Sequence, residues 1–561
     1  MRRGISAALV NDLAGAPNLY AQSVDSFDGA YGMQASQVLQ GYFVERQGRV
    51  ELHVAVQNLA AAKTAQVLTA EGAAAQGAIP LVNQIAKKLS PAARDFPSTN
   101  ETAFKDYGEA LRATDRASML SALEAAASED PQLSMAYLDR AEVLARGGDR
   151  EGALRVIEAG KRTSPDPIQA AKFDYVAALA RGDAAAREKS LEALSRLTPA
   201  DAKIVAELGE LQVAQRKFAD AARSYEQASR LNPQNDQPWN ELGYARAYAG
   251  DLAGARSALE QYQKLLPEGN ANALDSLGEV SFYRGDFAAA EKYFLEADQK
   301  NRAEFGGVDL LKAAQARLFA GDLAAADGIF HKYLGLLDAN QRSRAVYLEA
   351  QWEFLTGRRR AAMSALEKVI PALEGEGRAL ALIQLSLWKS ETGDAKTGSE
   401  LAAQAAQIAA SPATRNLSIL CRVIAKPDVV PTGSRLADAY ALMFAKKFAE
   451  AGPLFESTYR ETNPHNDGQI RTLLAWTYVK TNRARDAEAL TATYPIPLSS
   501  GEPMLASLIF PRFLFVRAAV LEQQGKRAEA KTAYELFLKY AGDAPDVFGD
   551  EEAARKSLGK L

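Results

Sequence analysis

The chain is poor in the side chains from which metal and redox sites are built. Its 561 residues include one cysteine, Cys421, and three histidines, His53, His331 and His465, which lie far apart in the sequence. A single cysteine forms neither an internal disulfide nor a cysteine metal cluster, and the histidine spacing does not indicate a metal site. We therefore expect no metal and no cofactor.

An excess of one charge and long apolar runs are also lacking. There are 66 basic and 70 acidic residues, a formal net charge of −4, so the balance does not indicate binding to nucleic acid or an anionic membrane. The apolar run Ile5 to Val10 is too short for a secretory signal. No stretch of about 18 uninterrupted apolar residues occurs, so we expect no membrane span and, by default, a cytoplasmic protein.

Motifs of known catalytic chemistry are absent as well. The sequence has no glycine-rich phosphate loop, no HRD or DFG kinase motif and no basic DNA-recognition helix. The densest basic run, Arg358 to Arg360, is interpreted as a solvated turn, and Cys421 as a buried inert thiol. We expect that the chain is not an enzyme, and an enzyme of unrecognised type is the weakest alternative.

What the sequence does contain is a repeat with a period of 34 residues. When residues 202–233 are laid over 236–267, Leu208-Gly209 falls on Leu242-Gly243 and Pro233 falls on Pro267. This is the tetratricopeptide pattern, in which each unit is a pair of antiparallel helices, here called helix A and helix B. The same register contains prolines at Pro131, Pro165, Pro199, Pro233 and Pro267. Proline suits the end of helix B, because it cannot continue the helix.

Glycine–aspartate pairs and small residues support the same register. The pairs are expected to form the turn between helices A and B, with the aspartate capping helix B. They are Gly148-Asp149, Gly182-Asp183, Gly250-Asp251, Gly285-Asp286 and Gly321-Asp322. Small residues are expected where the two helices of a pair approach closely. These are Ala141, Ala178, Gly209, Gly243 and Gly278 on helix A, and Ala153, Ala221, Ala255, Ala290 and Ala326 on helix B.

The first 95 residues show a different periodicity. Residues 3–13 have helical spacing, 19–24 are a short extended candidate, and 28–39 are expected to be helical although Gly29 and Gly32 weaken the pattern. Residues 38–46, 50–59 and 64–69 alternate as three strands, with a hairpin turn at Gln47-Gly48. Residues 79–89 form an amphipathic helix that could cover the sheet. The sequence predicts a small α+β domain here.

The stretch QVLQGYFVERQGRVELHVAVQNLAAAKTAQVLTAEG, between flanking helices, resembles the TolB amino-terminal-like or FlgO-like domain of bacterial proteins. That family usually begins with a buried strand ahead of the first helix, whereas this chain starts in the helix, and Asn58 stands where the family often has an acidic residue. The missing strand leaves open that the chain is a fragment whose start lies upstream, in which case a periplasmic or envelope-associated location is the alternative.

The predicted organisation is mainly α: a small α+β domain over 1–95, a tetratricopeptide α-solenoid superhelix over 96–410, an irregular break at 411–433, and further units with a terminal helix over 434–561. About eleven helix hairpins are expected, the units after residue 343 being looser. The tail AYELFLKYAGDAPDVFGDEEAARKSLGKL resembles the closing segment of repeat regions attached to bacterial serine/threonine kinases and winged-helix regulators.

A peptide-binding groove is predicted along helix A, on the inner surface of the superhelix, where aromatic rings and amides can hold an extended segment. The competing interpretation is that the aromatics pack between neighbouring repeats. The lysine–asparagine spacing of a carboxylate clamp is absent, since Lys172 is followed by Val176 and Asn240 by Tyr244. The candidate partner-binding residues are Asn240, Tyr244, Asp275, Glu279, Phe282, Gln315, Phe319, Tyr347, Gln351 and Phe354.

These observations favour a non-enzymatic scaffold that binds a protein or peptide partner in the groove, with no nucleic acid partner and self-association left open. The alternative is a sensory or regulatory module of a larger bacterial signalling protein, because the order of TolB-like domain, repeats and tail is similar to the sensory half of such proteins.

Overall fold

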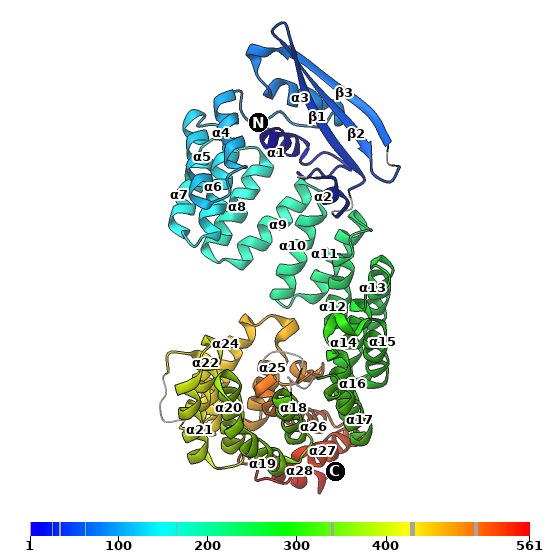
Figure 1. Ribbon diagram of the computed structural model, residues 1–561, viewed down its shortest axis with the longest axis vertical. Helices are drawn as coiled ribbons and strands as arrows, with labels where there is room; N and C mark the ends of the chain where they lie inside the picture. Colours follow the sequence, from blue (N-terminus) through cyan, green and yellow to red (C-terminus); the bar gives the residue numbers. More distant parts are fainter. Residues whose placement is uncertain are drawn as a thin grey trace. The chain divides into compact units, whose positions relative to one another are not determined.

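The computed structural model describes residues 2–24, 26–32, 35–61, 63–163, 165–337, 342–426, 432–498 and 503–561. The chain divides into two compact units, Met1–Ala249 and Gly250–Leu561 (Figure 1). Each unit is built mainly from helix hairpins, and a small antiparallel sheet precedes the hairpins of the first unit. The structure is therefore a tetratricopeptide-like α-solenoid with an N-terminal α+β element, as the 34-residue period predicts.

The N-terminal element is a three-stranded antiparallel sheet with the order β1-β2-β3 and one covering helix. Gln47 and Gly48 have φ of 49° and 77°, which is the turn that a two-residue hairpin requires. Leu52, Val54 and Val56 of β2 are buried, and α3 packs on β2 and β3. The bounds are α1 (Arg2–Leu13), α2 (Phe27–Gly32), β1 (Gln37–Arg46), β2 (Arg49–Asn58), β3 (Lys63–Ala73) and α3 (Ile79–Leu89).

Two expectations for this element are wrong, and one predicted strand is too short. Residues 19–24 form no strand, and the helix expected over 28–39 ends at Gly32. Residues 37–39 instead begin β1, because they pair with the end of β2, where Leu39 lies opposite Val56. β3 extends to Ala73 rather than 69, because it pairs with the whole length of β2 up to Arg49.

Helices α4 to α12 complete the first unit. Asn100 caps α4 by accepting hydrogen bonds from the N–H groups of Thr102 and Ala103, which ends the irregular linker at the predicted place. The bounds are α4 (Glu101–Ala110), α5 (Arg116–Glu129), α6 (Ser134–Arg146), α7 (Arg150–Lys161), α8 (Pro167–Arg181), α9 (Ala184–Leu197), α10 (Ala202–Ala214), α11 (Phe218–Leu231) and α12 (Gln237–Ala249).

The second unit contains the remaining helices. Their bounds are α13 (Leu252–Leu265), α14 (Asn272–Tyr283), α15 (Phe287–Phe305), α16 (Val308–Phe319), α17 (Leu323–Leu334), α18 (Arg342–Leu355), α19 (Arg359–Val369), α20 (Gly375–Glu391), α21 (Ala395–Ile408), α22 (Pro412–Ala425), α23 (Arg435–Phe444), α24 (Phe448–Glu461), α25 (Gly468–Lys480), α26 (Arg512–Gln523), α27 (Arg527–Ala541) and α28 (Asp550–Leu558). Short 3₁₀ turns, among them η5 (Ala489–Thr491) and η6 (Pro503–Leu508), lie between some of them.

The glycine–aspartate turns form as expected. Glycines 148, 182, 250, 285 and 321 all have positive φ, between 68° and 91°, which a residue with a Cβ rarely adopts. Each following aspartate accepts a hydrogen bond from a backbone N–H in the first turn of the next helix. Gly393-Asp394 forms the same turn and cap in one of the units that the sequence indicated as looser.

Small residues mark the closest approaches between the helices of a pair. The five alanines predicted on helix B are all completely buried. A Cβ on Gly209 would lie 3.1 Å from the ring of Tyr225, and one on Gly278 would lie 2.5 Å from the ring of Phe294. At Gly278 a larger residue would therefore overlap with a buried aromatic ring.

The C-terminal part departs from the predicted pattern in two places. Residues 411–433 were expected to be irregular, yet 412–425 form α22, because Ser411 caps the helix and Pro412 occupies its first turn. The unit that begins with α25 was expected to have a regular second helix. After Lys480 the chain instead runs through turns and η5, and the Arg471 side chain donates to the carbonyl oxygens of Leu490 and Thr493.

The stretch Pro503–Gln523 is long and apolar enough to cross a membrane by length and composition, which the sequence analysis did not anticipate. Its mean hydropathy is 1.8, and 89% of the apolar window is buried inside the protein. Phe510, Phe513 and Val516 have no exposed surface and belong to the large core of the second unit. In this structure the stretch is core, which explains its apolar composition.

We expect Gly278→Ala to destabilise the protein by about 1–3 kcal/mol, because the new methyl group would overlap with the ring of Phe294. The matched control is Gly328→Ala in α17, where a Cβ meets no atom within 4 Å, and this change should stabilise by about 0.5–1 kcal/mol. Urea unfolding measures both. Equal effects of the two substitutions would contradict the close helix contact at Gly278.

Candidate binding groove

The ten predicted groove residues lie on four consecutive A helices. Asn240 and Tyr244 are on α12 in the first unit, and the remaining residues are on helices of the second unit. Those on α14 are Asp275, Glu279 and Phe282, those on α16 are Gln315 and Phe319, and those on α18 are Tyr347, Gln351 and Phe354. The 34-residue period therefore places all ten on the helix type that was predicted.

In the second unit, amide side chains of the A helices bind the protein's own backbone. The side-chain oxygen of Gln315 accepts a hydrogen bond of 2.8 Å from the N–H of Leu498. The Gln384 side chain on α20 donates a hydrogen bond of 3.0 Å to the carbonyl oxygen of Met504. The Gln351 side chain donates a hydrogen bond of 2.8 Å to the side-chain oxygen of Gln384. Gln315, Gln351 and Gln384 are almost completely buried.

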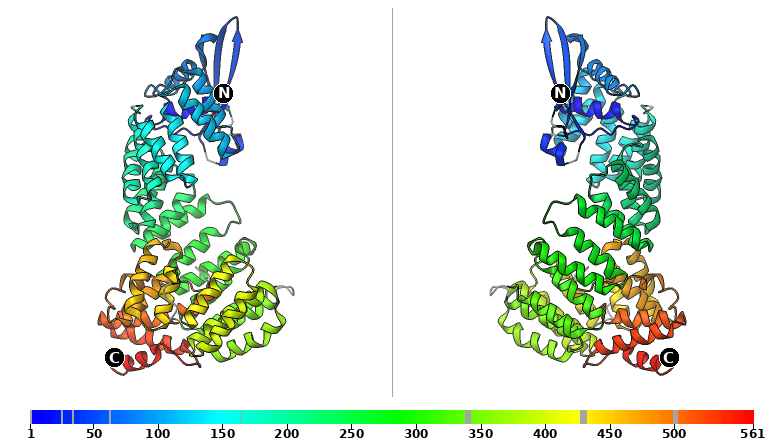
Figure 2. Two further views of the ribbon diagram at one scale, coloured as in Figure 1. Left: turned by 90° about the vertical axis from the view of Figure 1, so that its left-hand side faces the viewer. Right: turned by 90° about the vertical axis from the view of Figure 1, so that its right-hand side faces the viewer.

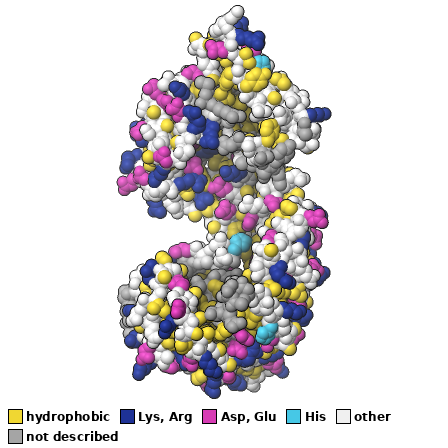
Figure 3. Space-filling view, viewed as in Figure 1, with side chains coloured by type: hydrophobic (Ala, Val, Ile, Leu, Met, Phe, Trp, Pro, Cys, Tyr) yellow, Lys and Arg dark blue, Asp and Glu magenta, His cyan; other side chains and the backbone are white. Residues whose placement is uncertain are grey.

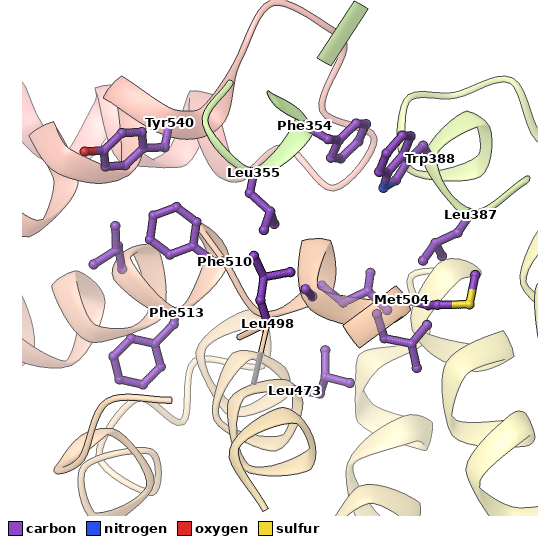
Figure 4. Close-up of a cluster of buried hydrophobic side chains, with 14 of the residues drawn as sticks. Phe354, Leu355, Leu387, Trp388, Leu473, Leu498, Met504, Phe510, Phe513 and Tyr540 are labelled. Atoms are coloured by element: carbon purple, nitrogen blue, oxygen red, sulfur yellow. The ribbon is translucent and has the colours of Figure 1, made fainter. Parts of the chain in front are cut away.

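The three phenylalanines predicted on this wall are buried by packing. Phe319 lies 4.9 Å from Phe510 and 5.1 Å from Phe282 between ring centroids, and Phe354 stacks on Trp388 at 4.3 Å. Figure 4 shows Phe354 and Trp388 in one cluster with Leu498, Met504 and Phe510. The packing interpretation of these aromatics accounts for their positions, and the predicted open groove is not present at these residues in this structure.

A cluster of charged groups lies on α14 and α16 of the same wall. The Lys312 ammonium contacts Asp275 at 2.6 Å and Glu279 at 2.7 Å. Burial raises the pKa of Asp309 to about 8, with a further rise from Asp275. Burial also raises the pKa of Asp275. One lysine therefore faces three carboxyl groups, at least one of which holds its proton at neutral pH, and the cluster joins the two helices.

A cavity of about 530 Å³ remains open in the first unit, a volume within the usual range for ligand sites. Its walls come from the A helices α4, α6, α8 and α10, from the B helix α9, and from α1 with the chain that follows it to residue 23. Charged and hydroxyl-bearing residues around it are Tyr20, Ser23, Tyr107, Asp139, Glu142, Arg146, Lys172, Tyr175, Thr198, Asp201, Lys203 and Glu207. Apolar residues, among them Leu138, Val176 and Leu194, complete the lining.

Two of the charged residues around this cavity form an ion pair with each other. Glu142 accepts two contacts from Arg146, at 2.9 Å from Nε and 2.8 Å from the second guanidinium nitrogen. The Tyr175 hydroxyl donates to Glu207, and burial, together with this carboxylate, raises the pKa of Tyr175 to about 12. Lys172 also lines the cavity, where its positive charge works to lower the pKa values of Asp139 and Asp201.

Asp139 is a titratable group of the cavity whose pKa is raised. Burial raises its pKa to about 6, although the Tyr107 hydroxyl, which donates to it over 2.7 Å, works in the opposite direction. Lys172 lowers the pKa by its charge, whereas Glu142 raises it. The charge of the cavity therefore becomes less negative as the pH falls below about 6.

The N-terminal chain holds one side of this cavity in place. Asn11 accepts a hydrogen bond of 3.0 Å from Gln169 on α8, and its carbonyl oxygen accepts one of 2.6 Å from Arg94. Ala14 packs on the apolar cluster around Ile168. Residues 14–23, which form no helix or strand, thus line the inner wall of the first repeats.

The sequence analysis did not select the residues of this cavity, although the period could have found them. Two repeats before Asn240, the same helix position is Lys172, and three repeats before Tyr244 it is Glu142. Both line the cavity. The contribution of residues 14–23 has no signal in the sequence, because that segment does not belong to the repeat.

Comparisons with known proteins add little beyond the repeat itself. No protein-family model and no curated protein matches the chain. Among solved structures it is similar to YrrB, described as a TPR protein with an unusual peptide-binding site, at 19% identity over 35% of this chain and 98% of that chain, with a TM-score of 0.30.

Two further likenesses are of the same kind. A tetratricopeptide repeat protein from Parabacteroides merdae is 18% identical over 46% of this chain and 100% of that chain, with a TM-score of 0.30. A chain of the structure of Naa15/Naa10 bound to HypK-THB is 15% identical over 82% of this chain and 79% of that chain, with a TM-score of 0.33. These TM-scores lie below 0.5, so the fold assignment depends on the helix hairpins of this structure itself.

We expect Gln315→Ala to lower the free energy of unfolding by about 1–3 kcal/mol, because the buried N–H of Leu498 would lose its acceptor. The control, Gln404→Ala on the exposed face of α21, should change stability by less than about 0.5 kcal/mol. Chemical denaturation measures both variants. A neutral Gln315→Ala would indicate that this wall is not closed by the chain in solution.

The stability difference between Asp139→Asn and the wild type should depend on pH. The folded protein keeps the Asp139 proton up to about pH 6, whereas an unfolded aspartate releases it near its ordinary pKa of 3.8. The stabilising contribution of this group is therefore complete below about pH 4 and is lost as the pH rises through 6. The variant should gain on the order of 2 kcal/mol relative to the wild type between pH 4 and 7. A difference that stays constant across this range would contradict the assignment.

Proposed function

We propose that the chain is a non-enzymatic interaction scaffold that holds a segment of a partner protein in the cavity of the first unit. The observation that carries this proposal is the cavity of about 530 Å³ on the A helices of successive repeats. A concave surface that exists before binding loses little conformational entropy when a partner arrives, which favours recognition without covalent chemistry.

The lining supports a polypeptide with both apolar and carboxyl-bearing side chains as the ligand. Leu138 and Val176 offer apolar contact, and Lys172 offers an ammonium group whose charge also acts on the carboxyl groups of Asp139 and Asp201. The Glu142–Arg146 pair presents both a donor and an acceptor at the rim. These groups suit an extended segment that places an acidic side chain next to Lys172 and an apolar side chain on α6 or α8.

Two finer expectations remain predictions. One is the resemblance of the N-terminal sheet to the TolB amino-terminal-like domain. The other is a role of the chain as the sensory half of a larger signalling protein, with any periplasmic or cytoplasmic location that this implies.

Selection of displayed peptides on the intact chain, followed by fluorescence anisotropy, tests the proposal. Selected peptides should contain an acidic residue, and Lys172→Glu should weaken their binding at least tenfold, or about 1.4 kcal/mol, because it places a carboxylate opposite the ligand's own. The matched control is Arg155→Glu, which makes the same charge change on the exposed α7 side chain.

Arg155→Glu should leave the affinity unchanged. The proposal would be contradicted by a selection that recovers no binder, or by peptides that bind Lys172→Glu as tightly as the wild type. A selection that recovers only peptides without acidic residues would contradict the assigned role of Lys172.

A further inference from the structure

Strand β1 is an edge strand with no neighbour on its outer side among the described residues. It is ten residues long and pairs only with β2. Tyr42 is 60% exposed, Leu39 39% and Phe43 38%, which is unusual for large apolar side chains in the middle of a strand. The strands extend beyond the helices of the first unit in both views of Figure 2, so the edge is accessible.

The apolar face of the sheet continues onto β1 without its cover. Leu39 lies opposite Val56 and Phe43 opposite Leu52, and residues that lie opposite each other in a pair point to the same face. Val56 and Leu52 are buried, and the helix α3 packs mainly on β3 and β2. Figure 3 shows hydrophobic side chains gathered over the sheet at the top of the view. The apolar residues Leu39 and Phe43 of β1 therefore lie beyond the part of the sheet that α3 covers.

The opposite edge of the sheet is protected in the usual ways. The Lys88 side chain on α3 donates to the carbonyl oxygen of Thr69 in β3, and Gln84 donates to that of Glu71 over 3.4 Å. β3 also begins with Lys63 and carries Glu71, and charged residues oppose the addition of a further strand. β1 has no such protection in its central residues 38–44, which contain no charge and no proline.

We propose that β1 pairs in antiparallel orientation with β1 of a second copy of this chain, with the two Gly41 residues opposite each other. In this register Leu39 of each copy lies opposite Phe43 of the other, and Val38 lies opposite Val44. Every large apolar residue on the covered face then meets another one across the interface, and cross-strand pairs of this kind stabilise a sheet.

The charges select this register over its neighbours. With Gly41 at the centre, Glu45 lies opposite Gln37 of the second copy, and no two like charges face each other. A shift that places Tyr42 at the centre would set Glu45 opposite Leu39, which removes the apolar pairing and takes a carboxylate partly out of water. A shift in the other direction, with Gln40 at the centre, leaves Phe43 opposite Gln37.

The expected product is a continuous sheet with the order β3-β2-β1-β1-β2-β3 around a two-fold axis. The free backbone groups of both edges become paired, and Leu39 and Phe43 of the two copies form one apolar patch between the two α3 helices. Because a single pair of strands buries less surface than a standard protein interface, we expect dissociation in the micromolar range. This surface is separate from the cavity of the first unit, so the dimer does not depend on the proposed function.

Light scattering on the intact chain over a range of concentrations tests the dimer. The mass should rise from that of one 60.4 kDa chain towards twice that value at tens of micromolar. The double variant Leu39→Lys and Phe43→Lys places lysines opposite each other and should remain monomeric at the same concentrations. The control, Val67→Lys, exchanges a similarly exposed apolar residue on β3 and should dimerise as the wild type does.

A cysteine cross-link tests the register. Residues directly opposite in an antiparallel pair have Cα atoms about 4.5–5.5 Å apart, so Gly41→Cys should form a disulfide-linked dimer on mild oxidation. Arg46→Cys should not, because the two copies of residue 46 lie about 30 Å apart in this register. The native Cys421 is buried and provides a low background.

Three results would overturn the proposal: a monomer at every concentration, a dimer that the double lysine variant leaves intact, or equal cross-linking of Gly41→Cys and Arg46→Cys. The first would indicate that the edge is open to a different occupant. The second and third would place the contact between copies elsewhere on the chain.

Discussion

The concave wall formed by the A helices must either stay hydrated or be covered, and the two units meet this constraint in different ways. In the second unit the wall carries Phe282, Phe319 and Phe354, which are at most 3% exposed. Leaving such rings in water would cost about 2 kcal/mol each, and Phe510 packs directly on Phe319. In the first unit the inner surface carries charged residues such as Lys172, and a cavity remains open.

The closed wall also shows how such a surface can bind polypeptide backbone. Gln315 accepts from one backbone N–H, and Gln384 donates to one backbone carbonyl, of the segment that covers them. These are the contacts expected of a peptide groove, but the peptide here belongs to the same chain. The lysine-centred cluster at Lys312 fits this account, because its charges are satisfied internally by Asp275 and Glu279.

Local signals in the sequence predicted the hairpins well, because a turn needs glycine at positive φ and a helix start needs a cap, as at Gly182 and Asp183. They also placed the ten selected residues on A helices. They could not predict that the stretch around Phe510 lies on α16, because a contact between residues about 190 positions apart leaves no periodic trace. For the same reason, the sequence could not predict that residues 14–23 line the cavity of the first unit.

Hydrogen–deuterium exchange of the intact chain measures most directly whether the second wall is closed by the protein itself. Peptic fragments within 503–523 should exchange as slowly as those of the buried helix α16, because both belong to one core. Fragments within 14–23, which lie in no helix or strand, should exchange much faster. Rapid exchange of 503–523 at neutral pH, with α16 still protected, would show that the segment leaves the wall in solution and would contradict the account.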